Sequence, residues 1–167
     1  MAATNLITDR TAEDVAEAKR LIEKFQSGKT LTESERAAYF AGLRGNYNYT
    51  DLNRVESKAA EVASLLTAAG YPTSISVKTN WRASDKLRRA DIVRYLDNIA
   101  AIRRILPESV APAAVPISRW IDYTAANDIE RTLWAVEAAL DGITQYLRRC
   151  GTFAAGGSYA AQIIRRA

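Results

Sequence analysis

The side chains whose spacing would suit acid–base chemistry are three pairs of neighbouring carboxylates. Two close carboxylates can serve as general acid and general base when their surroundings separate their pKa values. Each pair lies in or near the first turn of a predicted helix, where acids stabilise the positive end of the helix dipole. We therefore expect these acids to stabilise helix ends and not to catalyse a reaction. The pairs are Glu13 with Glu17, Glu33 with Glu35, and Asp128 with Glu130.

Nucleophilic and metal chemistry is limited by two features of the composition. The chain has no histidine, which excludes Ser-His-Asp and Cys-His nucleophile systems and every histidine-ligated metal. It has one cysteine, Cys150, which excludes an internal disulfide and a cysteine-rich metal site. Phosphate-binding, dinucleotide-binding and calcium-loop motifs are also absent from the sequence. The expectation is a protein without enzymatic activity, cofactor or metal.

Aromatic side chains at the predicted breaks between helices suit recognition of another protein. Trp, Tyr and Arg are enriched at the hot spots of protein interfaces. The alternative is that these residues anchor loops onto the core. The aromatic candidates for a partner interface are Tyr47, Tyr49, Trp81, Trp120 and Tyr123.

The length and charge of the chain suit one soluble domain. The 167 residues include 48% hydrophobic and 25% charged residues, which is ordinary for a globular protein. The net charge is +4, and the arginines come in short pairs that more often form solvated helix faces than a nucleic-acid footprint. Nucleic acid is therefore not the expected partner. The pairs are Arg88-Arg89, Arg103-Arg104, Arg148-Arg149 and Arg165-Arg166.

Five helices are predicted from apolar spacing and capping residues. Thr11 caps the first helix, and Gly28 ends it. A capping box beginning at Thr32 starts a second helix that reaches about residue 43. Thr50 is predicted to cap a long third helix that ends at Gly70. A fourth helix is expected over about 90–106, and a fifth is expected from its cap at Thr124 to about 149.

The segments between these helices complete a mainly α fold, a bundle of about five helices in a single domain, 1–167. A helical subdomain is expected over about 6–70 and a second helical part over about 84–149. Residues 71–82 are predicted to form a short irregular or β-hairpin segment, because Ile75 and Val77 alternate with polar residues. The proline-rich connector 107–117 is expected to lie across the helices. A C-terminal extension, 150–167, could form a hairpin at Gly156-Gly157.

The last long helix carries a heptad-like seam. Its apolar residues are spaced 4, 3, 4, 3 and 4 apart, which is typical of helices that pack along their length. The seam either faces the core of the same chain or forms a helix–helix contact between copies. Its residues are Ile129, Leu133, Val136, Leu140, Ile143 and Leu147.

Several stretches of the chain together resemble a known family. Their order and spacing are similar to those of prophage-encoded structural proteins of Firmicutes. In that family an ITDRT opening, a G-x-YN-x-TDLNRV turn, a TDW, an RYL-x-N and an N-x-IE recur, and Asn80 stands here where the family tends to have Asp. The matching stretches are Ile7-Thr8-Asp9-Arg10-Thr11, Leu43 to Glu56, Lys78-Thr79-Asn80-Trp81, Arg94-Tyr95-Leu96-Asp97-Asn98-Ile99 and Ala126-Asn127-Asp128-Ile129-Glu130.

The resemblance implies a role in a phage particle, since genes of the family tend to lie near tail, baseplate or tail-fibre genes. Within the matching turn, Asn53 and Arg54 are expected to point toward a neighbouring loop or a partner, so they join the interface candidates. The implied protein is a non-enzymatic structural or adaptor protein that binds other tail, baseplate or fibre proteins, with homo-oligomerisation as a further expectation. The alternative is a small prophage-encoded nucleic-acid-binding or regulatory protein.

The expected location follows from the same reasoning. The chain has no signal peptide and no run approaching the roughly 18 apolar residues of a membrane span. We expect it in the cytoplasm of the bacterial host during assembly, and then in the virion or phage-tail-like particle, with no membrane partner.

Overall fold

The computed structural model describes residues 5–109, 111–116 and 121–150, and these residues form five helices and no strand. This confirms the mainly α class. The proposed hairpin at Gly156-Gly157 lies outside the described residues, as does Trp120. The helices are α1 (Ala12–Gln26), α2 (Glu33–Ala41), α3 (Tyr49–Ala68), α4 (Arg89–Arg103) and α5 (Tyr123–Cys150).

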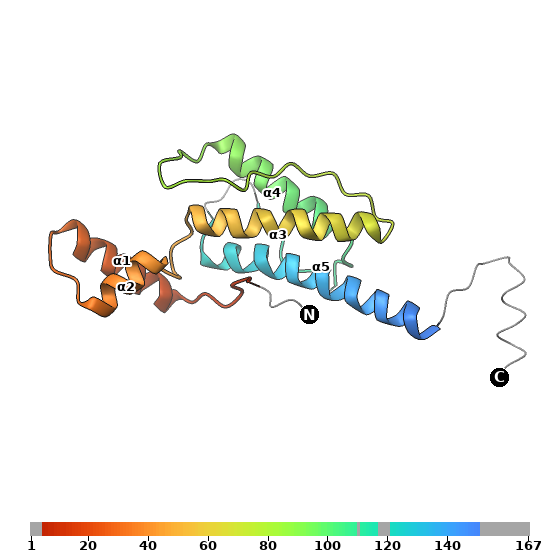
Figure 1. Cartoon of the computed structure of the whole chain (residues 1–167), viewed down its shortest axis with the longest axis horizontal. Helices are drawn as coiled ribbons and strands as arrows, with labels where there is room; N and C mark the ends of the chain where they lie inside the picture. Colours follow the sequence, from red (N-terminus) through yellow and green to blue (C-terminus); the bar gives the residue numbers. More distant parts are fainter. Residues whose placement is uncertain (1–4, 110, 117–120, 151–167) are drawn as a thin grey trace, which may run out of the picture.

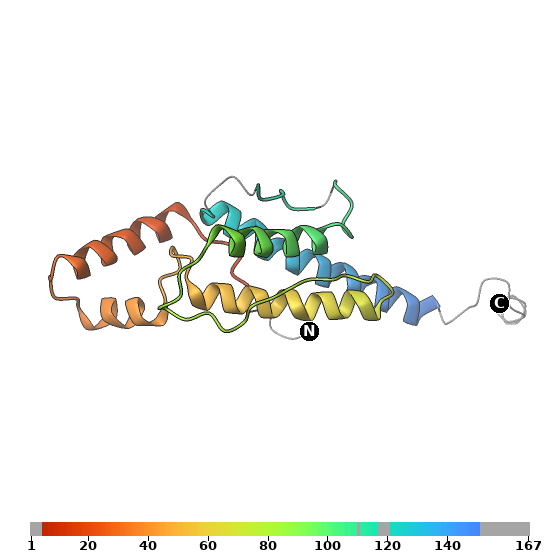
Figure 2. The same ribbon diagram turned by 90° about the horizontal axis from the view of Figure 1, so that it is seen from above.

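Helices α3, α4 and α5 lie side by side and run in the same direction (Figures 1 and 2). Ion pairs between α3 and α5 fit this arrangement, because Arg54 meets Glu130 and Lys58, one turn further along, meets Glu137. Parallel helices require connections that return along the whole bundle. The long segments that follow α3 and α4 make those returns, whereas α1 and α2 form a hairpin beyond one end of the bundle (Figure 1).

The core lies among the three parallel helices. Burying a large aliphatic side chain contributes about 1.5–3 kcal/mol, so this shared face is the main source of stability. Val55, Val62 and Leu66 of α3, together with Ile102 of α4, have no exposed surface. Four residues of the heptad-like seam are also buried: Ile129, Leu133, Val136 and Leu140. This part of the seam therefore packs inside the chain, while the side chains of Ile143 and Leu147 lie outside the described part.

The predicted caps are correct for the first two helices and shifted for two others. Thr11 and Thr32 cap α1 and α2 with complete capping boxes. The predicted cap Thr50 is wrong, because α3 begins at Tyr49 and Asn48 caps it. The Oδ1 atom of Asn48 accepts the Thr50 N–H at 2.8 Å, which is the bond an N-cap makes.

Helices α4 and α5 also differ from their predicted bounds. Thr124 is inside α5, and the cap bond comes from Asp122, whose Oδ1 accepts the Ala125 N–H at 2.8 Å. Helix α4 ends at Arg103, before the predicted residue 106, although Leu106 still packs into the core. Within the described part of the connector, Val115 packs against the core and Arg103 donates to the Pro112 carbonyl.

The base of the α1–α2 hairpin is fixed by a close backbone approach. A Cβ atom at Gly45 would lie 2.0 Å from the carbonyl oxygen of Asp14, so only glycine fits at this crossing. Arg44 reaches over the same point and pairs with Asp9 and Asp14. No helix in the described residues is long and apolar enough to cross a membrane.

Candidate functional site

The N-terminal strap, residues 7–10, is held on α5 by two polar side chains one helical turn apart. Asn127 bonds both backbone groups of Arg10, with Oδ1 accepting from the N–H at 3.0 Å and Nδ2 donating to the carbonyl at 2.9 Å. Glu130 accepts the Ile7 N–H at 2.6 Å and the Arg10 guanidinium at 2.8 Å. We call this set of four residues the first clasp.

A second clasp holds an internal strap, residues 78–81, on α3. Asn53 bonds both backbone groups of Trp81, accepting from the N–H at 2.7 Å and donating to the carbonyl at 2.9 Å. Glu56 accepts the Lys78 N–H at 2.7 Å and the indole N–H of Trp81 at 2.9 Å. These bonds explain why residues 71–82 adopt the irregular form of the two predicted alternatives and not the β-hairpin. Polar side chains of the helix supply the partners that a neighbouring strand would have supplied.

The two clasps match residue for residue. In each, an asparagine bonds the fourth strap residue, and a glutamate three positions later accepts from the first strap residue and from the side chain of the fourth. Residues three apart share one helix face, which permits this common geometry. The straps Ile-Thr-Asp-Arg and Lys-Thr-Asn-Trp begin at residues 7 and 78, and the helix motifs Asn-Arg-Val-Glu and Asn-Asp-Ile-Glu begin at 53 and 127. The structure thus repeats one strap-and-helix device.

An arginine from a neighbouring helix completes each clasp. Arg54 of α3 donates to Glu130 at 2.8 Å in the first clasp. Arg94 of α4 donates to both carboxylate oxygens of Glu56, at 2.5 and 2.8 Å, in the second. Asn98, one turn after Arg94, bonds both backbone groups of Ser76. The clasps therefore join α3 to α5 and α4 to α3.

The first clasp is part of a buried network of two arginines and two acids. Arg10 lies between Asp51 and Glu130, and Arg54 contacts the same two carboxylates. Glu130 has no exposed side-chain surface, and Arg10 is 2% exposed. Burial lowers the pKa of Arg54, but the adjacent carboxylates outweigh it and hold that pKa above its ordinary value. The four charges balance, so the network needs no further ion.

Two tyrosine hydroxyls meet beside this network. The Tyr47 and Tyr95 oxygens lie 2.5 Å apart, and the Arg10 guanidinium lies over the Tyr47 ring. Burial raises the pKa of both phenols above the ordinary value, because an ionised phenolate would be desolvated there. Both hydroxyls therefore remain protonated at neutral pH, and the pair joins the turn before α3 to α4.

The predicted interface residues divide into structural and surface positions. Asn53, Arg54 and Trp81 are committed to the clasps, and Tyr47 bonds Tyr95. Tyr49 is 41% exposed at the start of α3. Tyr123 is half-buried at the start of α5, and Trp120 lies outside the described residues. Only Tyr49 among those described presents a largely open side chain.

Each of the three carboxylate pairs has at least one member with a structural partner. Glu35 completes the capping box of α2, and Lys24, the Thr32 N–H and Arg20 together lower its pKa to about 2. Glu17 pairs with Arg20. Glu130 is enclosed in the first clasp, and Asp128 pairs with Arg131. No group of three or more potential metal ligands occurs in the part of the chain that the structure describes.

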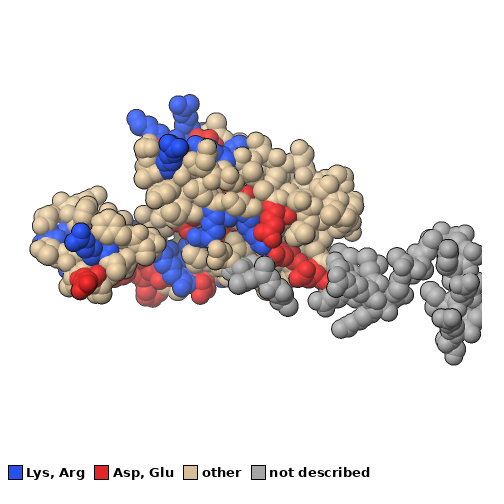
Figure 3. Space-filling model, viewed as in Figure 1, with Lys and Arg blue, Asp and Glu red and all other residues tan. Residues whose placement is uncertain are grey.

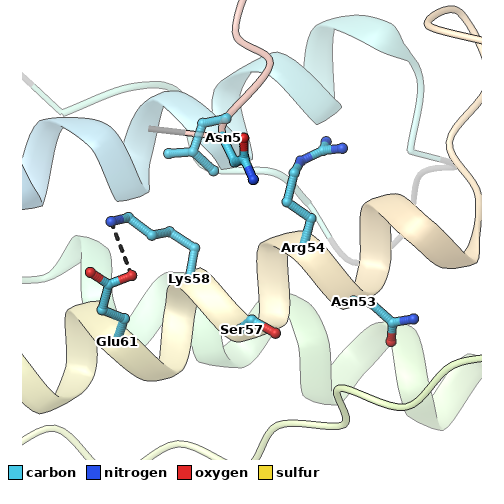
Figure 4. Close-up of a pocket in the computed structure, with 7 residues that line it drawn as sticks. Asn5, Asn53, Arg54, Ser57, Lys58 and Glu61 are labelled. Carbon is cyan, nitrogen blue, oxygen red and sulfur yellow. Dashed lines mark hydrogen bonds and ion pairs between the residues drawn. The ribbon is translucent and has the colours of Figure 1, made fainter. Parts of the chain in front are cut away.

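A hollow of about 440 Å³ lies beside the first clasp, between α3 and residues 5–6 (Figure 4). Its cations already have partners, since Arg54 pairs with Glu130 and Lys58 pairs with Glu61 and Glu137. Asn53 points away from Arg54, toward the internal strap (Figure 4). The hollow therefore offers a polar surface with little uncompensated charge.

The α1–α2 hairpin carries an aromatic surface that the sequence did not single out. The rings of Phe25 and Tyr39 stack at 4.8 Å, and Phe40 meets Tyr39 edge-on at 5.6 Å. Phe40 is 69% exposed and Phe25 is 50% exposed. No residue of α2 is buried, and Ala37, Ala38 and Ala41 are exposed around Phe40. The signal was the short run of alanines and aromatics in 37–41, in which Tyr39 stacks on α1 while Phe40 stays exposed.

Comparisons of the chain with protein families, with curated proteins and with solved structures return no significant match.

Proposed function

We propose that this protein is a non-enzymatic structural or adaptor component of a phage tail or phage-tail-like particle, in the baseplate or tail-fibre region. Its role is protein–protein assembly. The observation that carries the assembly role is the α1–α2 hairpin, which projects beyond the bundle and exposes Phe25 and Phe40 (Figure 1). The assignment to a tail particle is supported by the sequence resemblance alone.

The hairpin supports assembly because it leaves apolar surface uncovered that a partner would bury. Helix α2 contributes no buried side chain, and α1 contributes only Ala18 and Leu21. Covering an exposed phenylalanine ring contributes about 1.5–3 kcal/mol. A contiguous exposed apolar patch on a small protein typically marks an interaction site. The partner is another tail, baseplate or fibre protein, or a further copy of this chain.

The clasps support the same role in a different way. They hold two extended straps and three helices in one arrangement through buried hydrogen bonds and ion pairs. A buried polar network of this kind specifies one packing of the chain. The stretches that carry the resemblance, from Ile7 to Glu130, are the stretches that form the clasps. The residues that carry the resemblance therefore stabilise the fold. The choice of partner depends on the exposed surfaces of that fold.

The test combines two measurements on the full chain. Sedimentation gives its mass in solution, and mass spectrometry of particles purified from the encoding strain shows whether the chain is a particle component. We expect an oligomer, a stable complex with a tail protein, or the chain in the particle. A protein that is strictly monomeric and absent from purified particles would refute the proposal.

A further inference from the structure

The excess positive charge of the chain is concentrated in one exposed loop. Residues 82–89 contain four cations and one acid, a net charge of +3, whereas the whole chain carries +4. All eight residues are exposed. Figure 3 shows lysine and arginine side chains gathered over this loop and the start of α4. We call residues 82–89 the basic loop, and its cations are Arg82, Lys86, Arg88 and Arg89.

The cations of the basic loop differ from most arginines of the chain in their lack of acidic partners. None of the four forms an ion pair with any acid in the described residues, and the one acid of the loop, Asp85, pairs with Lys78. Elsewhere the arginines of the described part mostly have acidic partners. Those that pair are Arg10, Arg20, Arg44, Arg54, Arg94, Arg103 and Arg131.

Two of these four cations also lie at the N-terminus of a helix, where positive charge is unfavourable. Arg88 is the N-cap of α4 and Arg89 is its first residue. The N-terminus of a helix carries partial positive charge, so cations there destabilise the helix where an acid would stabilise it. The helix end therefore gains nothing from the charges of Arg88 and Arg89, although the carboxylate of Asp91 in the first turn accepts the Arg88 N–H at 3.0 Å. A negatively charged partner would neutralise both the side chains and the helix end.

We infer that the basic loop is a docking surface for an acidic face of another protein. Leu87 lies among the four cations and is 46% exposed, which gives the loop an apolar centre within a positively charged rim. An apolar centre with a charged rim is the usual anatomy of a protein–protein interface. The inference rests on the assembly role proposed above and adds a second surface with a defined partner chemistry.

A protein partner fits this loop better than nucleic acid does. Single-stranded nucleic acid is bound by basic grooves with aromatic rings on which bases stack, and residues 82–89 contain no aromatic residue. Duplex binding uses a broad basic surface. Outside the loop the chain carries 19 cations and 18 acids, a net charge of only +1. Most of the net positive charge therefore lies in the basic loop. A small basic surface of this kind matches an acidic patch on another protein.

The experiment measures binding of the full chain to a fluorescent peptide of glutamates with leucine at every third position. A duplex DNA with the same label is the competing probe. We expect the peptide to bind more tightly than the DNA, with affinity falling between about 50 and about 300 mM salt. Exchanging both arginines in R88E/R89E should weaken peptide binding about tenfold, and Leu87→Ser should weaken it less.

The matched control is K19E/K29E, which reverses two exposed charges on the hairpin and should leave peptide affinity unchanged. Circular dichroism of each variant checks that the fold is retained. Tighter binding of DNA than of peptide, no binding of either probe at low salt, or equal weakening by both double variants would each overturn the inference. The peptide assay needs no particle, so its failure is distinguishable from absence of the chain from particles.

Discussion

The side-chain amide of Asn127 bonds the backbone of Arg10 twice. Its Oδ1 atom accepts the Arg10 N–H at 3.0 Å, and its Nδ2 atom donates to the Arg10 carbonyl at 2.9 Å. A side chain on a helix thus satisfies the donor and the acceptor of one extended residue, as a paired strand would. The side-chain amide of Asn53 likewise bonds both the N–H and the carbonyl of Trp81. Both arrangements are anchored by a glutamate on the same helix face, so the two straps are held by the same chemistry at two places in the bundle.

The first prediction concerns these asparagines. Asn127→Ala should lower the free energy of unfolding by about 2–4 kcal/mol, because it leaves both backbone groups of Arg10 buried without partners. Asn53→Ala should act in the same direction by a smaller amount, because Asn53 is only half-buried. Urea denaturation followed by circular dichroism measures both. Asn46→Ala, at an exposed turn, is the control. If Asn127→Ala proved no more harmful than that control, the clasp would have no energetic role.

The second prediction concerns the buried charges of the first clasp. Glu130→Gln should lower the free energy of unfolding by about 3–5 kcal/mol, since it leaves Arg10 and Arg54 with only Asp51 to balance them. Glu17→Gln, which removes an exposed partner of Arg20, should leave unfolding unchanged. Both are measured by chemical denaturation at neutral pH. A small effect of Glu130→Gln would mean that the network is solvated in solution.

The third prediction concerns alkaline pH. The pKa values of Tyr47 and Tyr95 are raised in the folded protein, so the folded state retains their protons at a pH where the unfolded state has lost them. Stability is therefore fully present below the ordinary tyrosine pKa of about 10 and falls as pH rises above it. Thermal unfolding between pH 8 and pH 12 should show this decline.

The double variant Y47F/Y95F removes both phenols and should flatten the alkaline decline while lowering stability at neutral pH through loss of the hydroxyl pair. Tyr71→Phe, at a 47% exposed position, is the control and should keep the decline. An unchanged alkaline decline in Y47F/Y95F would assign it to other groups.

The sequence predicted the helices better than it predicted their connections. Caps such as Thr11 and Thr32 act through bonds to residues three positions away, which a sequence pattern can reveal. The bond from Asn127 to Arg10 spans 117 residues, and no local pattern contains it. Ile75 and Val77 alternate as in a strand, but the partners of that segment are side chains of Glu56 and Asn98. The alternation of apolar and polar residues cannot distinguish a segment paired with a strand from one bonded by side chains of helices.

The candidate site shows the same difference between what a local sequence pattern reveals and what depends on packing. Trp81 was predicted as an interface candidate because tryptophan is common at hot spots, yet its indole N–H bonds a buried glutamate. Phe40 belongs to a short amphipathic-looking helix, and nothing in the sequence says that the Phe40 side of this helix stays uncovered. Whether an aromatic residue is an anchor or a contact depends on tertiary packing. The structure supplies that information, with Phe40 69% exposed and Trp81 4% exposed.

The fourth prediction separates stability from binding at the basic loop. R88E/R89E places acids at the N-terminus of α4, where they interact favourably with the helix dipole. The variant should therefore unfold at a higher temperature, with a gain of about 0.5 kcal/mol, although its affinity for the acidic peptide falls. Calorimetry of both proteins at low salt measures the gain. R103E/R104E at the other end of α4 is the matched control and should destabilise, because it puts acids at the negative end and breaks the Arg103–Glu108 pair.

The last prediction concerns the hairpin surface. Phe40→Ser should leave the unfolding midpoint nearly unchanged, because the ring is 69% exposed and α2 has no buried residue to lose. The same change should reduce oligomer formation or incorporation into particles, because a partner that covers this ring would lose about 1.5–3 kcal/mol of burial. Trp134→Ser is the matched control, since that ring is 54% exposed on α5, away from the hairpin. Equal losses of assembly in the two variants would mean that the hairpin has no special role. Loss only in Trp134→Ser would place the contact on the bundle.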